Sequence, residues 1–197
     1  MTAFSLSLST AVIAAALAGA PAQQPAGTPQ AGPETITLMA AVPAPATATG
    51  SVDVPITIRI DRYTPEHART TMVDGLKYGG YPGFLKALRE APAAGTLEVG
   101  GKKFTIRWAR QEKTDTGRTL SFVTDTPVYF VGGWQNDAKS TKGYELAVVQ
   151  LTLDGSGKGE GTMAAAARVK PQGTTGVQID DYAGTPVKLS TTAPVRK

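Results

Sequence analysis

Apolar and polar residues alternate most regularly between residues 51 and 61. This period of two is that of a β-strand with one face buried and the other face in solvent. Pro55 stands among the polar positions and has no N–H group for a sheet hydrogen bond, so an edge position or a bulge is predicted there. The apolar positions of this strand are Val52, Val54, Ile56, Ile58 and Ile60.

The period lengthens to that of a helix shortly after this strand. Thr64, Pro65 and Glu66 have the order of an N-cap, a first-turn proline and a first-turn acid. Gly79 and Gly80 interrupt the helical pattern, which resumes near residue 82 and stops before residue 92. Two short helices are therefore predicted directly after the first strand. Their apolar positions are Ala68, Met72 and Leu76 in the first helix and Phe84, Leu85 and Leu88 in the second.

From residue 96 onward the chain has the pattern of antiparallel strands joined by short turns. Gly100-Gly101 is typical of a two-residue hairpin turn. Residues 144–153 are apolar at successive positions for part of their length, which predicts a central strand covered on both faces. We expect an α+β fold of about seven or eight strands, arranged as an antiparallel, strongly twisted sheet or a partly open barrel.

An uncharged apolar run covers residues 4–18 and is followed by Ala20-Pro21-Ala22. The run is shorter than the roughly 20 residues that a membrane-crossing helix needs. Residues 1–22 are therefore predicted to be a signal peptide, cleaved after Ala22 or alternatively after Ala20. No Lys or Arg precedes the run, so a retained anchor and a different start are the alternatives. The mature chain is expected to be periplasmic or secreted, without a transmembrane span.

Pro, Ala, Gly, Thr and Gln make up most of residues 23–50, where Glu34 is the only charge. Such a segment buries too little apolar surface to offset its conformational entropy, which predicts a flexible linker. A short apolar island at residues 36–39 is expected to dock at the edge of the domain. Residues 51–197 are then the single folded domain.

Few residue types suited to metal or redox chemistry occur in this chain. The absence of cysteine excludes disulfides and thiolate sites, and with His67 as the one histidine an all-protein zinc site is not expected. His67 is expected on the surface of the first helix, because no nucleophile motif accompanies it. Residues 154–160 match neither a calcium loop nor a phosphate loop, since Lys158 and Gly159 stand where oxygen ligands are required. No catalytic set, metal or cofactor is predicted.

Positive charge is concentrated between residues 102 and 118. This segment carries six bases and two acids, an excess equal to the formal net charge of +4 for the whole chain. Arg107 and Arg110 are candidates for contact with an anionic surface. The alternative is the solvated face of a half-buried strand, because apolar residues alternate with these bases. Nucleic acid is not expected as a partner, since no RNP, helix-turn-helix or zinc-finger signature is present.

Aromatic residues flank paired glycines at two places, in Tyr78-Gly79-Gly80-Tyr81 and in Gly132-Gly133-Trp134. Aromatic side chains in loops stack on sugars or anchor protein partners, and glycine lets a ligand approach the backbone. Tyr78, Tyr81 and Trp134 are therefore candidate binding residues. The alternative is that they cap the end of the core.

Three stretches resemble uncharacterised exported bacterial proteins. They are IRIDRYT at residues 58–64, TDTPV at residues 124–128, and LTLD at residues 151–154 running into GKGEG at residues 157–161. The resemblance implies a recurring exported domain, and that group has no known activity or site residues to transfer.

Export, a tether and the lack of a catalytic set favour a non-enzymatic domain that binds a ligand or partner. An envelope protein, a glycan and an anionic surface are the candidate partners. A hydrolase that uses carboxylates is the enzymatic alternative, because carboxylates are the remaining plentiful titratable groups. A structural domain that contacts anionic surfaces through the 102–118 segment is the third hypothesis.

Overall fold

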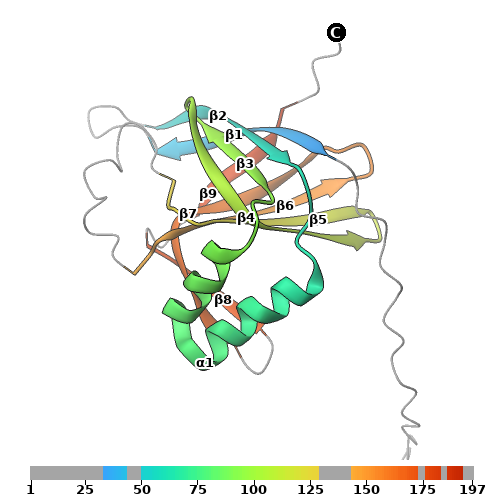
Figure 1. The fold of residues 1–197 in the computed structure, drawn as a ribbon. Helices are drawn as coiled ribbons and strands as arrows, with labels where there is room; N and C mark the ends of the chain where they lie inside the picture. The colour runs from blue at the N-terminus through green and yellow to red at the C-terminus, as the bar shows by residue number, and fades with distance from the viewer. Residues whose placement is uncertain (1–32, 44–49, 129–142, 173–175, 183–185, 193–197) are drawn as a thin grey trace, which may run out of the picture.

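A computed structural model describes residues 33–43, 50–128, 143–172, 176–182 and 186–192 of this chain (Figure 1). These residues form nine strands and one helical element. The elements are β1 (Glu34–Pro43), β2 (Ser51–Ile60), α1 (Glu66–Glu90), β3 (Gly95–Val99), β4 (Lys102–Thr114), β5 (Gly117–Thr124), β6 (Leu146–Asp154), β7 (Gly159–Gln172), β8 (Gly176–Asp181) and β9 (Val187–Thr191).

Eight of the strands close into an antiparallel barrel, in the order β1-β2-β3-β4-β5-β6-β7-β9 and back to β1. β7 makes this closure possible because it is long. Its first part pairs with β6 and β9, and its second part leaves the barrel and pairs with β8. The expectation of an α+β fold with an open sheet or a partly open barrel is therefore corrected to a mostly-β fold, a closed barrel with one extra strand and one helical element.

Closure depends on β1, which lies inside the segment predicted to be a linker. β1 pairs with β2 from Glu34↔Ile60 to Pro43↔Ser51, and its middle also pairs with β9. Residues 36–39 were expected to dock at the edge of the domain. They are instead part of β1, a barrel strand that pairs with a neighbour on each side. The folded unit includes residues from Glu34 onward, rather than from Ser51. The predicted signal peptide, residues 1–22, lies outside the described residues.

Aliphatic side chains fill the interior of the barrel. The alternation predicted for β2 is confirmed for Ile56, Ile58 and Ile60, which are at most 1% exposed, whereas Val52 near the start of the strand is 48% exposed. Leu38 of β1 and Phe122 of β5 belong to the same buried cluster. Eight strands enclose a space just wide enough for side chains to fill, so this interior is a packed core.

A second apolar layer covers one side of the barrel from outside, where α1 and β8 lie (Figure 1). Leu146 and Val148 of β6 face this layer, whereas Ala147 and Val149 face the interior. The prediction of a central strand covered on both faces is therefore confirmed. The helix contributes Met72, Leu76, Phe84 and Leu88 to this layer.

The two predicted helices are one element, α1, with a kink at Gly80. Gly80 has φ 61° and ψ −160°, which is not helical, and the two arms of α1 fold back on each other (Figure 1). The arms touch where Gly83 faces Gly75: a Cβ atom on Gly83 would lie 2.4 Å from the carbonyl oxygen of Gly75. Only glycine permits this approach of two helix backbones.

Thr64 does not cap α1, although its position predicted a cap. Pro65 occupies the N-cap position without a side-chain hydrogen bond. The Thr64 hydroxyl instead accepts a hydrogen bond from the N–H of Ala109 at 3.0 Å, and the Thr64 N–H donates to the Ala109 carbonyl at 2.8 Å. A bulge in β4 between Ile106 and Trp108 lies beside this contact. The Thr64 hydroxyl therefore binds the backbone of β4 and does not cap α1.

The turn between β3 and β4 agrees with the predicted hairpin. Gly100 and Gly101 have φ values of 55° and 78°. Positive φ at both central residues is what a tight turn of this twist requires. No helix in the described ranges is long and apolar enough to cross a membrane.

Candidate binding groove

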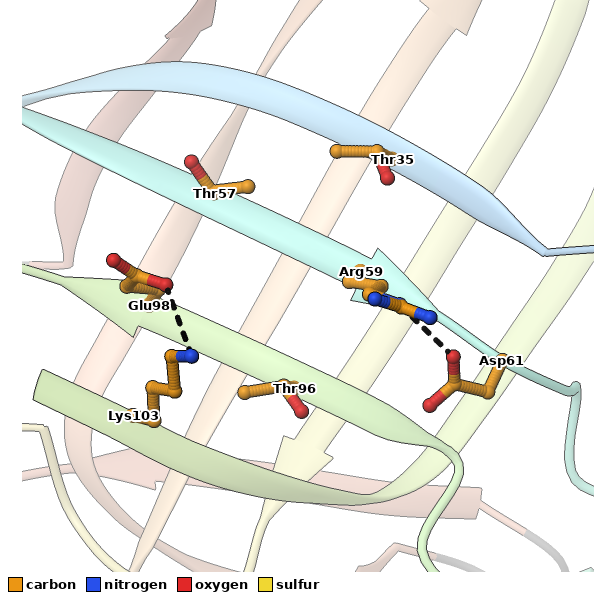
Figure 2. Close-up of a pocket in the computed structure, with 7 residues that line it drawn as sticks. All are labelled: Thr35, Thr57, Arg59, Asp61, Thr96, Glu98 and Lys103. Atoms are coloured by element: carbon orange, nitrogen blue, oxygen red, sulfur yellow. Dashed lines mark hydrogen bonds and ion pairs between the residues drawn. The ribbon is translucent and has the colours of Figure 1, made fainter.

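A polar groove of about 270 Å³ lies on the outer face of β1, β2, β3 and β4 (Figure 2). Its lining follows from the strand period, since the residues between the inward-facing isoleucines of β2 point outward. α1 lies on the other side of the barrel and leaves this face open (Figure 1). The groove is lined by Thr35, Thr57, Arg59, Asp61, Thr96, Glu98 and Lys103.

Strand register brings these side chains together in two neighbouring rows. In the first row, Arg59 of β2 stands opposite Thr35 of β1 and Thr96 of β3. In the second row, Glu98 of β3 stands opposite Thr57 of β2 and Lys103 of β4. Side chains directly opposite on adjacent strands are close enough to act together on one ligand.

Two ion pairs lie in this groove. The Nε atom of Arg59 is 3.1 Å from Oδ1 of Asp61, and the Nζ atom of Lys103 is 4.0 Å from Oε2 of Glu98. The side chains are between 45% and 71% exposed. Exposed pairs of this kind contribute only about 0–1 kcal/mol to stability, so a ligand can rearrange them at little cost.

The two carboxylates that line the groove are 46% and 45% exposed. Asp61 and Glu98 each face a base on an open surface. A hydrolytic pair would flank one scissile bond, with the acid in a shielded environment. Within the described residues, no group of three or more His, Asp or Glu is placed to hold a metal ion.

The two aromatic candidates that the structure describes, Tyr78 and Tyr81, have different surroundings. Tyr78 is 79% exposed at the bend of α1, with the Lys77 ammonium 5.4 Å from its ring centroid. Tyr81 turns inward, where its hydroxyl accepts a hydrogen bond from the N–H of Glu145 at 3.0 Å and burial raises its pKa. Tyr81 therefore has the position of a core-capping residue. Trp134 lies outside the described residues.

Arg107 and Arg110, the candidates for anionic contact, both have carboxylate partners. Arg107 binds Asp125 at 2.7 Å and the carbonyl oxygen of Ala91, at the end of α1, at 3.0 Å. Arg110 binds Glu112 at 2.9 Å. Lys103 and Arg118 of the same segment are also ion-paired, so much of its excess charge is compensated locally.

A polar network at one end of the barrel was not predicted. The Arg118 guanidinium binds both carboxylate oxygens of Glu34, and it also donates to Gln111 at 3.1 Å. The Tyr63 hydroxyl donates to Glu34 at 3.1 Å. Burial and the nearby Glu34 charge raise the pKa of Tyr63 to about 12. Glu34 and Arg118 are 84 residues apart, so no local pattern could have paired them.

Replacing Glu34 with glutamine is expected to lower the free energy of unfolding by about 1–2 kcal/mol, because Arg118 would lose its counter-charge in a partly buried place. The side chains of this pair are 25% and 19% exposed, which limits the loss through solvent screening. Urea unfolding followed by tryptophan fluorescence measures the change. Glu98→Gln is the matched control, since its ion pair is exposed and its loss is expected to cost below about 0.5 kcal/mol. Equal effects of the two changes would contradict a stabilising role for the Glu34–Arg118 pair.

A second hollow of about 280 Å³ lies near this network. Its polar groups are largely engaged already. Asp154 accepts hydrogen bonds from Ser156 and from the Lys158 N–H, and these bonds lower its pKa. Arg118 is held by Glu34. The hollow is lined by Gln111, Lys113, Gly117, Arg118, Asp154, Gly155 and Gly157.

The extra strand is tied to the barrel by another cluster that sequence reasoning missed. Asp180 of β8 binds Lys170 and Arg168 of β7, each at 2.8 Å, and these bonds lower the pKa of Asp180 to about 2. The Arg168 guanidinium lies 4.6 Å from the ring centroid of Tyr144, and the Tyr144 and Tyr182 rings meet edge to face at 5.4 Å. These contacts hold β8 against the second part of β7.

Comparisons of the chain with protein-family models, with curated proteins and with solved structures found no match. Function is therefore inferred from the groove and its surroundings.

Proposed function

We propose that this protein is an exported, non-catalytic binding domain whose ligand lies in the groove on the outer face of β1–β4. The observation that supports this proposal is the groove itself, where hydroxyls and charges of both signs from four strands line one depression. The arrangement offers many hydrogen bonds and places no carboxylate in a shielded position for chemistry.

The ligand is proposed to bind on the outer surface because side chains fill the interior of the barrel. Small eight-stranded barrels that carry a ligand inside have room left between their side chains. Here Leu38, Ile58, Leu120 and Met163 from different walls are all 0% exposed within one apolar cluster. A ligand accordingly binds outside the barrel.

Export and the tether remain part of the proposal. Because β1 belongs to the barrel, the proposed linker after the signal peptide shortens to residues 23–33. Its Pro, Ala, Gly and Gln content suits a spacer that carries the barrel away from an attachment point.

The test is co-sedimentation of the purified protein with three probes: an insoluble neutral polysaccharide, an immobilised anionic polysaccharide and anionic phospholipid vesicles. Thr96 lines the groove from β3, directly opposite Arg59, so a tryptophan at this position occupies part of the groove and Thr96→Trp is expected to weaken binding by roughly tenfold or more.

Thr152→Trp is the matched control, because Thr152 is an exposed strand threonine on β6 that does not line the groove. It is expected to bind like the unaltered protein. Retention that is the same in both tryptophan variants, or no retention on any probe, would overturn the proposal.

A further inference from the structure

We infer that the ligand of this groove is a neutral, hydroxyl-rich chain, which is a segment of an uncharged glycan. The inference rests on the proposed binding function and specifies the chemical class of its ligand. Charge balance, hydroxyl placement and the chemistry of the lining each support it.

Charge in the groove is balanced. Two bases, Arg59 and Lys103, lie beside two acids, Asp61 and Glu98, within the same depression. A polyanion would be attracted by the two bases and repelled by the two acids. A polycation would be attracted by the acids and repelled by the bases. An uncharged ligand suffers neither repulsion, so charge complementarity favours it.

Hydroxyl groups can use both members of each ion pair at once. A hydroxyl donates one hydrogen bond and accepts others, so one sugar hydroxyl can donate to Asp61 while another accepts from the guanidinium of Arg59. Hydrogen bonds to charged groups are stronger than those between neutral groups. Because both side chains are largely in water already, this contact requires little desolvation of the free protein.

Three threonines extend this polar lining beside the two ion pairs (Figure 2). Thr35, Thr57 and Thr96 belong to β1, β2 and β3, and adjacent strands lie about 4.8 Å apart. The groove therefore extends about 14 Å across the strands from β1 to β4, which is three strand spacings. This width suits a short length of polymer lying across the strands better than one small molecule.

Among the residues that the structure describes, the groove has no wholly apolar side chain for a lipid or an apolar peptide to pack against. Each of its residues has a hydroxyl, a carboxylate or a cationic group, and no aromatic or aliphatic side chain is among them. Lipid tails and apolar peptide side chains bind in pockets lined mainly by apolar side chains. These ligands are therefore a poor chemical match for the groove.

The distinguishing experiment is affinity electrophoresis of the native protein in gels that contain either a neutral polysaccharide or an anionic one. We expect retardation in the neutral gel, and we expect it to change by less than about twofold between about 0.05 M and about 0.5 M salt. The groove-filling variant Thr96→Trp is expected to lose the retardation, and Thr152→Trp is expected to keep it.

Two charge-removing variants separate the ligand classes. Lys103→Gln and Glu98→Gln both keep polar side chains in the groove. A neutral ligand loses one charge-assisted hydrogen bond in each variant, so both are expected to bind it more weakly than the unaltered protein and by a similar factor of up to about tenfold. An anionic ligand would bind Lys103→Gln more weakly and Glu98→Gln more tightly.

The outcomes distinguish this inference from the proposed function. Retardation only by the anionic polymer, falling with salt and abolished by Thr96→Trp, would overturn the glycan class and leave the binding function supported. Retardation in neither gel, or retardation unchanged by Thr96→Trp, would overturn both.

Discussion

Replacing Leu38 with alanine is expected to lower the free energy of unfolding by about 3 kcal/mol, within the range of about 2–5 kcal/mol for buried leucines. Leu38 is 0% exposed and lies in the middle of β1, where the strand pairs with both β2 and β9. The change leaves a cavity at the position where the barrel closes. Urea unfolding followed by tryptophan fluorescence measures the loss.

The matched control for this prediction is Met39→Ala. Met39 is the next residue of β1, points outward and is only partly buried, so its truncation is expected to cost below about 1 kcal/mol. A flexible linker at residues 34–43 would make both changes nearly neutral. Small and equal effects would therefore contradict the placement of β1 in the barrel.

Replacing Gly83 with alanine is expected to destabilise the protein by about 2–3 kcal/mol, the upper part of the range for overpacking. The added Cβ atom would lie 2.4 Å from the carbonyl oxygen of Gly75. Both groups are backbone atoms of helical arms, so neither can rotate away as a flexible side chain could. The arms must separate, which loosens Leu76 and Phe84 against the barrel.

Gly79→Ala provides the control in the same element. Nothing lies within 4 Å of a Cβ atom at Gly79, and its φ is not positive. Alanine is the better helix former there, so a neutral or stabilising effect of up to about 1 kcal/mol is expected. Trp108 packs near this layer and reports unfolding through its fluorescence. Equal stability of the two variants would contradict the close contact between the arms.

The elements that the sequence predicted well are those whose pattern is complete within a few neighbouring residues. The alternation of Ile56, Ile58 and Ile60 depends on one strand, and the Gly100-Gly101 turn depends on two positive φ angles. The interruption at Gly79 and Gly80 likewise marked the bend of α1, although the two arms form one element. The spacing of apolar residues along a strand and the ability of glycine to adopt positive φ are local properties, so the sequence alone reveals them.

The candidate site was predictable only in part. A glycan was among the ligands expected from the sequence, yet the residues chosen for binding were Tyr78, Tyr81, Trp134, Arg107 and Arg110. Trp134 lies outside the described residues, and the other four do not line the groove. Thr35, Thr57 and Thr96 are ordinary outward positions of three strands. Their meeting depends on strand register, which no segment reveals when taken alone.

β1 shows why closure could not be predicted. Ile36, Leu38, Ala40 and Val42 do alternate, but small and polar neighbours rich in Ala, Thr and Pro gave the segment the composition of a linker. Its burial comes from β2 on one side and from β9 on the other, about 150 residues later.

Strand alternation, the tight turn, the apolar character of β6 on both faces and the lack of cysteine chemistry all follow from the chain as written. The closed barrel, the Glu34–Arg118 pair and the balanced groove depend on which distant segments meet. Local periods are set by the geometry of a single strand or helix, whereas pairing across 84 residues is selected by the packing and hydrogen bonding of the whole barrel.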